Sequence, residues 1–312
     1  MDMITASLLA EFSSEYELTG LPEDQRFEHF AAYVAVRRHY SEPFEPSDIV
    51  VGAGGDLGID AAAIIVNGLL LNDPEEFQEL LVTNPDYLDV SFIFVQAERS
   101  SSFDASKLGN FGYGVSEFFN AETKEPKNER IAVAIELMKA IYSKSSKFKR
   151  GNPTCRLYYV TTGKWSGEGA LEARRVKVQE ELQSLEYFSA VEVLPVGAVD
   201  LQRYYNQTRN SISREFLFAN RQDVPEIPGV KEAFVGFVPA KFFLPIISDG
   251  GEIVRSIFYD NVRDFQGYNG VNDEIRQTLK SPRKARFVLM NNGITIIARS
   301  VIPRRQFRSV SD

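Results

Sequence analysis

The chain has 312 residues, 44% of them hydrophobic and 25% charged, which is enough for two domains that each bury a core. A single cysteine, Cys155, excludes an internal disulfide and a cysteine-rich zinc site, and it predicts a reducing, cytoplasmic location. The net charge of −8 argues against a general nucleic-acid coat protein, although an enzyme needs only one basic face. No stretch reaches the roughly 18 apolar residues of a membrane span and the N-terminus lacks a basic signal region, so we expect no membrane partner.

The first predicted elements are helices. Residues 1–20 read as a short helical segment, and Pro22 suits the first turn of a helix that reaches about His39. That helix carries an apolar stripe at helical spacing, formed by Phe27, Phe30, Ala31 and Val34. Glu28 lies beside the stripe, where it is either a plain surface glutamate or a carboxylate that reaches the end of a sheet.

Three strands are predicted next, over 48–52, 58–68 and 89–97, because short β-branched runs are bounded there by Gly, Asn and Asp. A helix over 73–83 separates the last two strands. The glycine-rich turn AGGDLG precedes a strand rather than a helix and lacks a Lys-Ser/Thr pair, so we reject a nucleotide-binding loop.

Strands and helices then alternate, which predicts an α/β layered domain over residues 1–215. The later helices are expected within 100–119 and over 129–142, 168–187 and 200–207, and the later strands over 155–162 and 190–196.

Polar side chains follow the ends of two predicted strands. Asp60 begins one strand, while Gln96 and Glu98 end the next and share a face because they are two residues apart. If these strands are neighbours, the three side chains can converge on one point. Oxygen ligands at a sheet end are how hydrolytic enzymes hold a hard divalent cation.

Positive charge is unevenly distributed. Residues 137–167 contain no acid and seven basic side chains, including Lys147, Lys149 and Arg150, and a second basic cluster lies over 280–286. Each cluster is either a solvated loop face or a contact for nucleic acid. We take Lys107, Lys147, Lys149 and Arg150 as candidate nucleic-acid contacts.

A proline-rich linker over 221–229 predicts a second, smaller domain over 230–312. A strand near residue 256, a helix from about Val271 and two strands around an Asn-Asn-Gly turn within 287–300 give it an α+β character. The sequence stops within a β-type pattern, so we expect residues 230–312 to be the first part of this domain.

Two sets of motifs resemble known families. GGDLGIDAAAIIVNG followed by FIFVQAERSSSF resembles the Mrr-like branch of the nucleases with a restriction-endonuclease fold, whose sequence pattern is a helical Glu, a GGDxGxD turn and Gln-x-Lys. YDNVRDFQG, VNDEIRQTL and FVLMNNGITIIA are similar to motifs of the AIPR proteins of abortive infection and phage resistance. The resemblance implies a mixed central sheet flanked by helices, followed by an AIPR-type domain.

The resemblance also implies residue roles. Glu28 matches the helical acid, Asp60 the metal-binding Asp and Gln96 the first residue of Gln-x-Lys, with Mg²⁺ or Mn²⁺ as the cofactor. Asp56, the earlier acid of the turn, is expected to shape it rather than bind metal. The implied reaction is hydrolysis of a phosphodiester by activated water.

The chain departs from the family pattern at Glu98, which stands where the pattern has Lys. Three interpretations stay open: a substitution introduced to abolish activity, a natural variant in which Glu98 binds metal, or a domain that no longer cuts. Arg99 points to the opposite face of the strand and cannot replace the lysine, whereas Lys107 on the following helix could reach in.

Two classes of function follow. The first is a phage-defence nuclease acting on DNA or, less favoured, RNA, with a homodimer expected by analogy. The second is an inactive nuclease-like module that binds nucleic acid, a phage-derived protein or a partner of the defence system.

Overall fold

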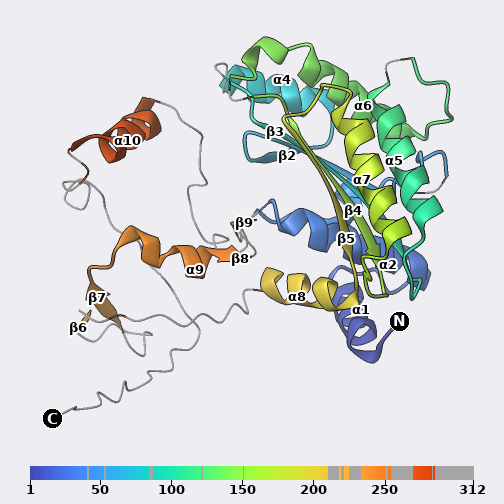
Figure 1. Ribbon diagram of the computed structural model, residues 1–312, viewed down its shortest axis with the longest axis horizontal. Helices are drawn as coiled ribbons and strands as arrows, with labels where there is room; N and C mark the ends of the chain where they lie inside the picture. Colours follow the sequence, from blue (N-terminus) through green and yellow to red (C-terminus); the bar gives the residue numbers. More distant parts are fainter. Residues whose placement is uncertain are drawn as a thin grey trace. The chain divides into compact units, whose positions relative to one another are not determined.

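The structure is a computed structural model and describes residues 1–40, 42–52, 54–83, 87–120, 122–149, 151–209, 218, 221–224, 233–249, 252–253, 270–282 and 284 (Figure 1). By its internal contacts the chain divides into two units, Met1–Phe265 and Gln266–Asp312, and each is described by itself. The domain boundary predicted between residues 215 and 230 falls largely outside the described residues and stays a prediction.

A five-stranded mixed sheet forms the centre of the first unit, in the order β2-β1-β3-β4-β5. Strand β1 is antiparallel to both β2 and β3, whereas β3, β4 and β5 are parallel to one another. The strands are β1 (Ala61–Val66), β2 (Leu69–Leu71), β3 (Val90–Glu98), β4 (Thr154–Thr161) and β5 (Ala190–Val196). The predicted mixed α/β class, with helices flanking a central sheet, is therefore confirmed.

Helices cover both faces of this sheet (Figure 1). One face packs against α4 (Pro74–Thr83), α5 (Ala105–Phe119), α6 (Glu129–Tyr142) and α7 (Gly169–Gln183). The other packs against α1 (Met3–Glu15), α2 (Glu23–Arg37), α3 (Pro46–Ile49) and α8 (Ala198–Thr208). Successive side chains of a strand point to opposite faces, so β3 sends Phe92 and Phe94 to the first face and Ile93 and Val95 to the second.

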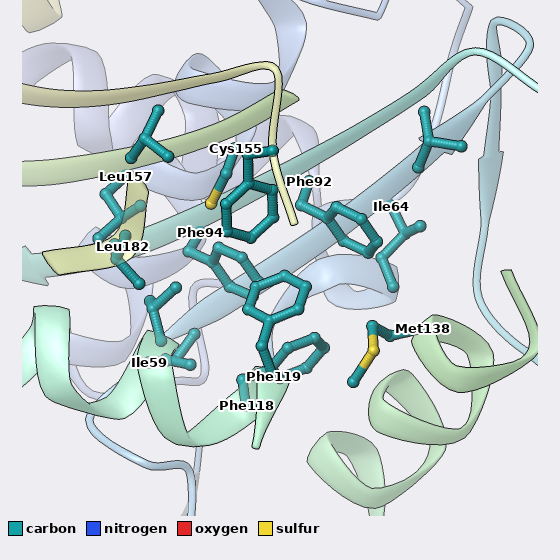
Figure 2. Packing of buried hydrophobic residues seen from close by; sticks show 14 of the residues in the cluster. Ile59, Ile64, Phe92, Phe94, Phe118, Phe119, Met138, Cys155, Leu157 and Leu182 are labelled. Atoms are coloured by element: carbon teal, nitrogen blue, oxygen red, sulfur yellow. The ribbon is translucent and has the colours of Figure 1, made fainter. Parts of the chain in front are cut away.

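The core on the α5 face is rich in aromatic rings (Figure 2). The ring of Phe94 meets that of Phe118 edge-on at 5.0 Å between centroids, and Phe92 meets Phe119 at 5.1 Å. Edge-to-face pairs add to the stabilisation that comes from burial alone. Cys155 lies fully buried beside these rings and is a packing residue.

The remaining described elements are short. They are the pairs β6 (Arg221–Asp223) with β7 (Phe234–Gly236) and β8 (Ser248–Asp249) with β9 (Glu252–Ile253), the helix α9 (Leu244–Ile247) and the 3₁₀ turns Ser145–Lys147 and Ala240–Phe242.

In the second unit, α10 (Gly270–Lys280) confirms the helix predicted from about Val271. The strands predicted near residue 256 and within 287–300 lie outside the described residues. No helix in the described ranges is long and apolar enough to cross a membrane.

Two local features differ from the sequence prediction. The strand predicted over 48–52 is wrong, because Pro46 begins the single helical turn α3 and Asp48 accepts a hydrogen bond from the Glu45 N–H at 3.3 Å. Only Val50 keeps β character, as a single bridge to Ala61. The prediction also missed the tight hairpin of β1 and β2, whose Asn-Gly turn is a known hairpin signal.

Candidate metal centre

The start of β1 and the end of β3 meet at one end of the sheet. The Asp60 N–H donates to the Val95 carbonyl at 2.9 Å, and one Asp60 carboxylate oxygen accepts from the Ala97 N–H at 2.6 Å. Ala61 stands opposite Val95, so the antiparallel register places Asp60 opposite Gln96. The two strands are neighbours, as the prediction of a converging site required.

Gln96 presents an unsatisfied acceptor at this sheet end. Its side-chain Oε1 is buried and accepts no hydrogen bond from the described residues. A buried amide oxygen without a partner costs free energy, and a cation or a water molecule would satisfy it. Its chemistry, an uncharged hard oxygen, fits a ligand of Mg²⁺ or Mn²⁺.

Negative charge accumulates around Asp60. Burial raises the pKa of its carboxyl group to about 7, and the carboxylates of Glu28, Asp56 and Glu98 add to this, whereas the hydrogen bond from Ala97 acts in the opposite direction. Burial also raises the pKa of Glu28, with help from the charges of Asp24 and Asp56. Four carboxyl groups therefore act on one another at this end of the sheet, and a bound cation would relieve their repulsion.

Glu98 is held by two side chains. The Lys107 Nζ, in the first turn of α5, lies 2.6 Å from Glu98 Oε1, and this pairing raises the pKa of the lysine. The Tyr159 hydroxyl donates to Glu98 Oε2 at 3.4 Å. Lys107 therefore reaches the end of β3, where the resemblance places a lysine. Arg99 points to the other face and lies 3.5 Å from Glu23 of α2, as strand alternation predicts.

The predicted ligands are only partly assembled. Across the described part of the chain, no three His, Cys, Asp or Glu side chains stand close enough to hold one metal ion. Asp60 and Gln96 are adjacent, but Glu98 is turned to Lys107, and Glu28 approaches from α2, where its Oε2 lies 3.7 Å from the position of a Cβ at Gly52. The residues fit a divalent cation in donor type and charge, and binding would require Glu98 to leave Lys107.

The predicted nucleic-acid contacts that the structure describes, Lys107, Lys147 and Lys149, are not brought together. The Lys147 carbonyl accepts from the Leu88 N–H at 2.9 Å, which places Lys147 just before β3, at the end of the sheet opposite Gln96. Gln96 lies eight positions after Leu88 along the extended chain, a span of about 26 Å. Lys149 follows two residues later, and Arg150 lies outside the described residues. Of the candidates within the described residues, Lys107 contacts a predicted site residue, Glu98.

Sequence reasoning missed two residues that hold the site. Tyr159, in β4, had no signal beyond its place in an apolar strand. Asn128 precedes α6 and is recognisable from sequence as a helix cap, but its bonds to the turn before Asp60 depend on the tertiary fold.

Comparison with known proteins gives a match in the C-terminal part of the chain. A family model described as AIPR protein matches residues 258–310, a range of which the structure describes 270–282 and 284. No curated protein and no solved structure matches the chain. The match supports the second of the two resemblances found in the sequence: residues 258–310, called the AIPR segment below, are similar to AIPR proteins.

Proposed function

We propose that the chain is a metal-dependent nuclease that cleaves phosphodiester bonds, with DNA as the favoured substrate, and that it acts in phage defence by abortive infection. The observation that carries the nuclease proposal is the pairing of the half-buried Asp60 with Gln96, whose buried Oε1 has no partner among the described residues. The AIPR segment supports the phage-defence setting.

The side chains divide the chemistry between them. Asp60 and Gln96 would hold Mg²⁺ or Mn²⁺, with Glu28 and Glu98 as further oxygen ligands. When bound, such an ion polarises a phosphoryl oxygen and lowers the pKa of the attacking water. Lys107 can donate to a phosphate oxygen and stabilise the charge that grows there, because its exposed ammonium group stands between Glu98 and solvent.

A binding module that does not cut is the second candidate. The observation that favours it is the close Glu98–Lys107 ion pair, which neutralises the lysine at the position where a nuclease needs free positive charge. In that case the carboxylate end would have lost its catalytic role, and the AIPR segment would carry the recognition of a partner.

A cleavage assay on the chain and on Glu98→Lys separates the two. Plasmid DNA and RNA are incubated with Mg²⁺ or Mn²⁺, and Asp60→Asn is the control in each background. If both forms cleave, Glu98 is compatible with an active site. If only Glu98→Lys cleaves, Glu98 is the residue that disables the nuclease. The nuclease proposal fails if neither form cuts and calorimetry detects no Mn²⁺ binding that depends on Asp60.

A further inference from the structure

The glycine-rich turn before Asp60 contains one non-glycine residue, Leu57, in a left-handed backbone conformation. Gly54, Gly55 and Gly58 have φ values of 78°, 65° and 70°, and Leu57, which is not a glycine, has a φ of 59°. A branched side chain in the left-handed region costs free energy, so contacts from outside the turn must hold it. The turn matters to the site because it carries Asp56.

Asn128 binds this turn with its side-chain amide and its backbone. Its Nδ2 donates to the Val51 carbonyl at 2.7 Å and lies 3.3 Å from the carbonyl oxygens of Gly52 and Gly54. Its backbone N–H donates to the Gly55 carbonyl at 2.8 Å. The other end of the same amide, Oδ1, accepts from the Ile131 N–H at 2.9 Å and so caps α6. One side chain therefore links the start of a helix to the turn.

Close packing leaves the turn little freedom to move. A Cβ on Gly114 of α5 would lie 1.7 Å from the Leu57 carbonyl oxygen, so the turn touches the backbone of α5. Arg130 donates to the Val50 carbonyl at 2.9 Å just before the turn. Helices α5 and α6 thus define where the turn lies.

We infer that Asn128 is a positioning residue of the carboxylate site, which holds the turn so that Asp56 and the backbone of Gly52 stay beside Glu28 and Asp60. Its effect on metal binding rests on the proposed function, whereas its hold on the turn does not. Asn128 acts through the turn and not on the reacting atoms.

Substituting Asn128 with Asp separates the two roles of the side chain. Asp caps a helix as well as Asn does, and its charge is favourable at a helix N-terminus, so α6 should be preserved. Asp has no hydrogen to donate to the three carbonyl groups of the turn. Asn128→Ser is the uncharged counterpart, because serine also caps helices but is too short to replace the amide.

The matched control is Asn67→Asp, at the other end of β1. Asn67 also uses both ends of its amide, donating to the Tyr87 carbonyl at 3.0 Å and accepting from the Asp89 N–H at 2.8 Å. Asn67→Asp therefore removes the same amide N–H donor as Asn128→Asp does, but far from the candidate site.

Hydrogen–deuterium exchange and Mn²⁺ titration calorimetry on the full chain test the inference. In Asn128→Asp and Asn128→Ser, the amides of residues 54–60 should exchange about ten times faster, as expected for the loss of one or two hydrogen bonds, while α6 keeps its protection. Mn²⁺ affinity should fall about ten-fold, the usual effect of losing a residue that orients ligands. Asn67→Asp should change neither quantity.

Two results would overturn the inference. Wild-type exchange of residues 54–60 in both Asn128 variants would show that the amide does not hold the turn. Faster exchange with unchanged Mn²⁺ affinity would show that the turn does not position the site. If the unsubstituted chain binds no Mn²⁺ and does not cut, the proposed function fails and the positioning of a metal site with it, while the exchange data still decide whether Asn128 holds the turn.

Discussion

The two ends of the central sheet differ in charge and in construction. At one end, where β1 begins and β3 ends, half-buried carboxyl groups stand around Asp60 and Gln96. At the other, the Asn67 turn and the segment around Lys147 close the sheet through hydrogen bonds to backbone carbonyl groups. A phosphodiesterase needs negative charge for its metal and positive charge for its substrate. Lys147, in the acid-free stretch 137–167, lies at the opposite end and cannot supply positive charge beside the carboxyl groups. Lys107 does reach the carboxylate end.

The largest expected effect is a loss of cleavage activity when the carboxylate end of the sheet is changed but not when the opposite end is. Asp60→Asn should lower Mg²⁺-dependent cleavage by on the order of 10³-fold, as expected when one member of a catalytic set is removed. Asp89→Asn makes the same change next to the first residue of β3, at the opposite end, and should leave cleavage unchanged. The comparison is made with initial cleavage rates at saturating metal. Equal losses in the two variants would mean that the carboxylate end has no special role.

The carboxylate end should also make stability fall as the pH rises. Because the pKa of Asp60 rises from 3.8 to about 7 on folding, the folded protein retains a proton that the unfolded chain has released between these values. The free energy of unfolding should therefore fall as the pH rises through this window, by at most about 4 kcal/mol from this group. Urea unfolding with EDTA should show a weaker pH dependence in Asp60→Asn. Parallel curves for the two proteins would contradict the assignment.

Lys107→Ala should reduce cleavage by about 10- to 100-fold, because the variant loses the ammonium group that can stabilise charge on the phosphate. Lys177→Ala is the control, since Lys177 forms an exposed ion pair with Glu181 on α7 at 3.6 Å. Single-turnover rates report the chemical step and should change in the first variant only. Undiminished cutting by Lys107→Ala would remove this lysine from the mechanism.

The smallest effect is expected at the basic end. Lys147→Ala and Lys149→Ala should weaken DNA binding about two- to three-fold and reduce its salt dependence by about one unit of slope per lysine. The rate at saturating DNA should not change, since the Lys147 carbonyl binds the N–H of Leu88, which lies about 26 Å along the extended chain from Gln96. A loss of rate at saturation would show that the two ends work together.

The sequence by itself determined most of the secondary structure and the mixed α/β class. Periodicity located α2, α4 and α6 closely, because helical stripes and caps are local signals. It also placed Asp60, Gln96 and Glu98 at strand ends, since a side-chain period of two is a local property. It failed at residues 48–52, where a proline and a capping acid outweighed the β-branched run.

Only the tertiary structure decided which of these residues meet. The antiparallel register of β1 and β3 sets Asp60 opposite Gln96, and the start of α5 brings Lys107 to Glu98. The parallel pairing of β3 and β4 places Lys147 at the far end of the sheet, and the packing of α6 brings Asn128 to the turn. These contacts join residues distant in sequence, and their formation depends on the whole core, so no local pattern encodes them.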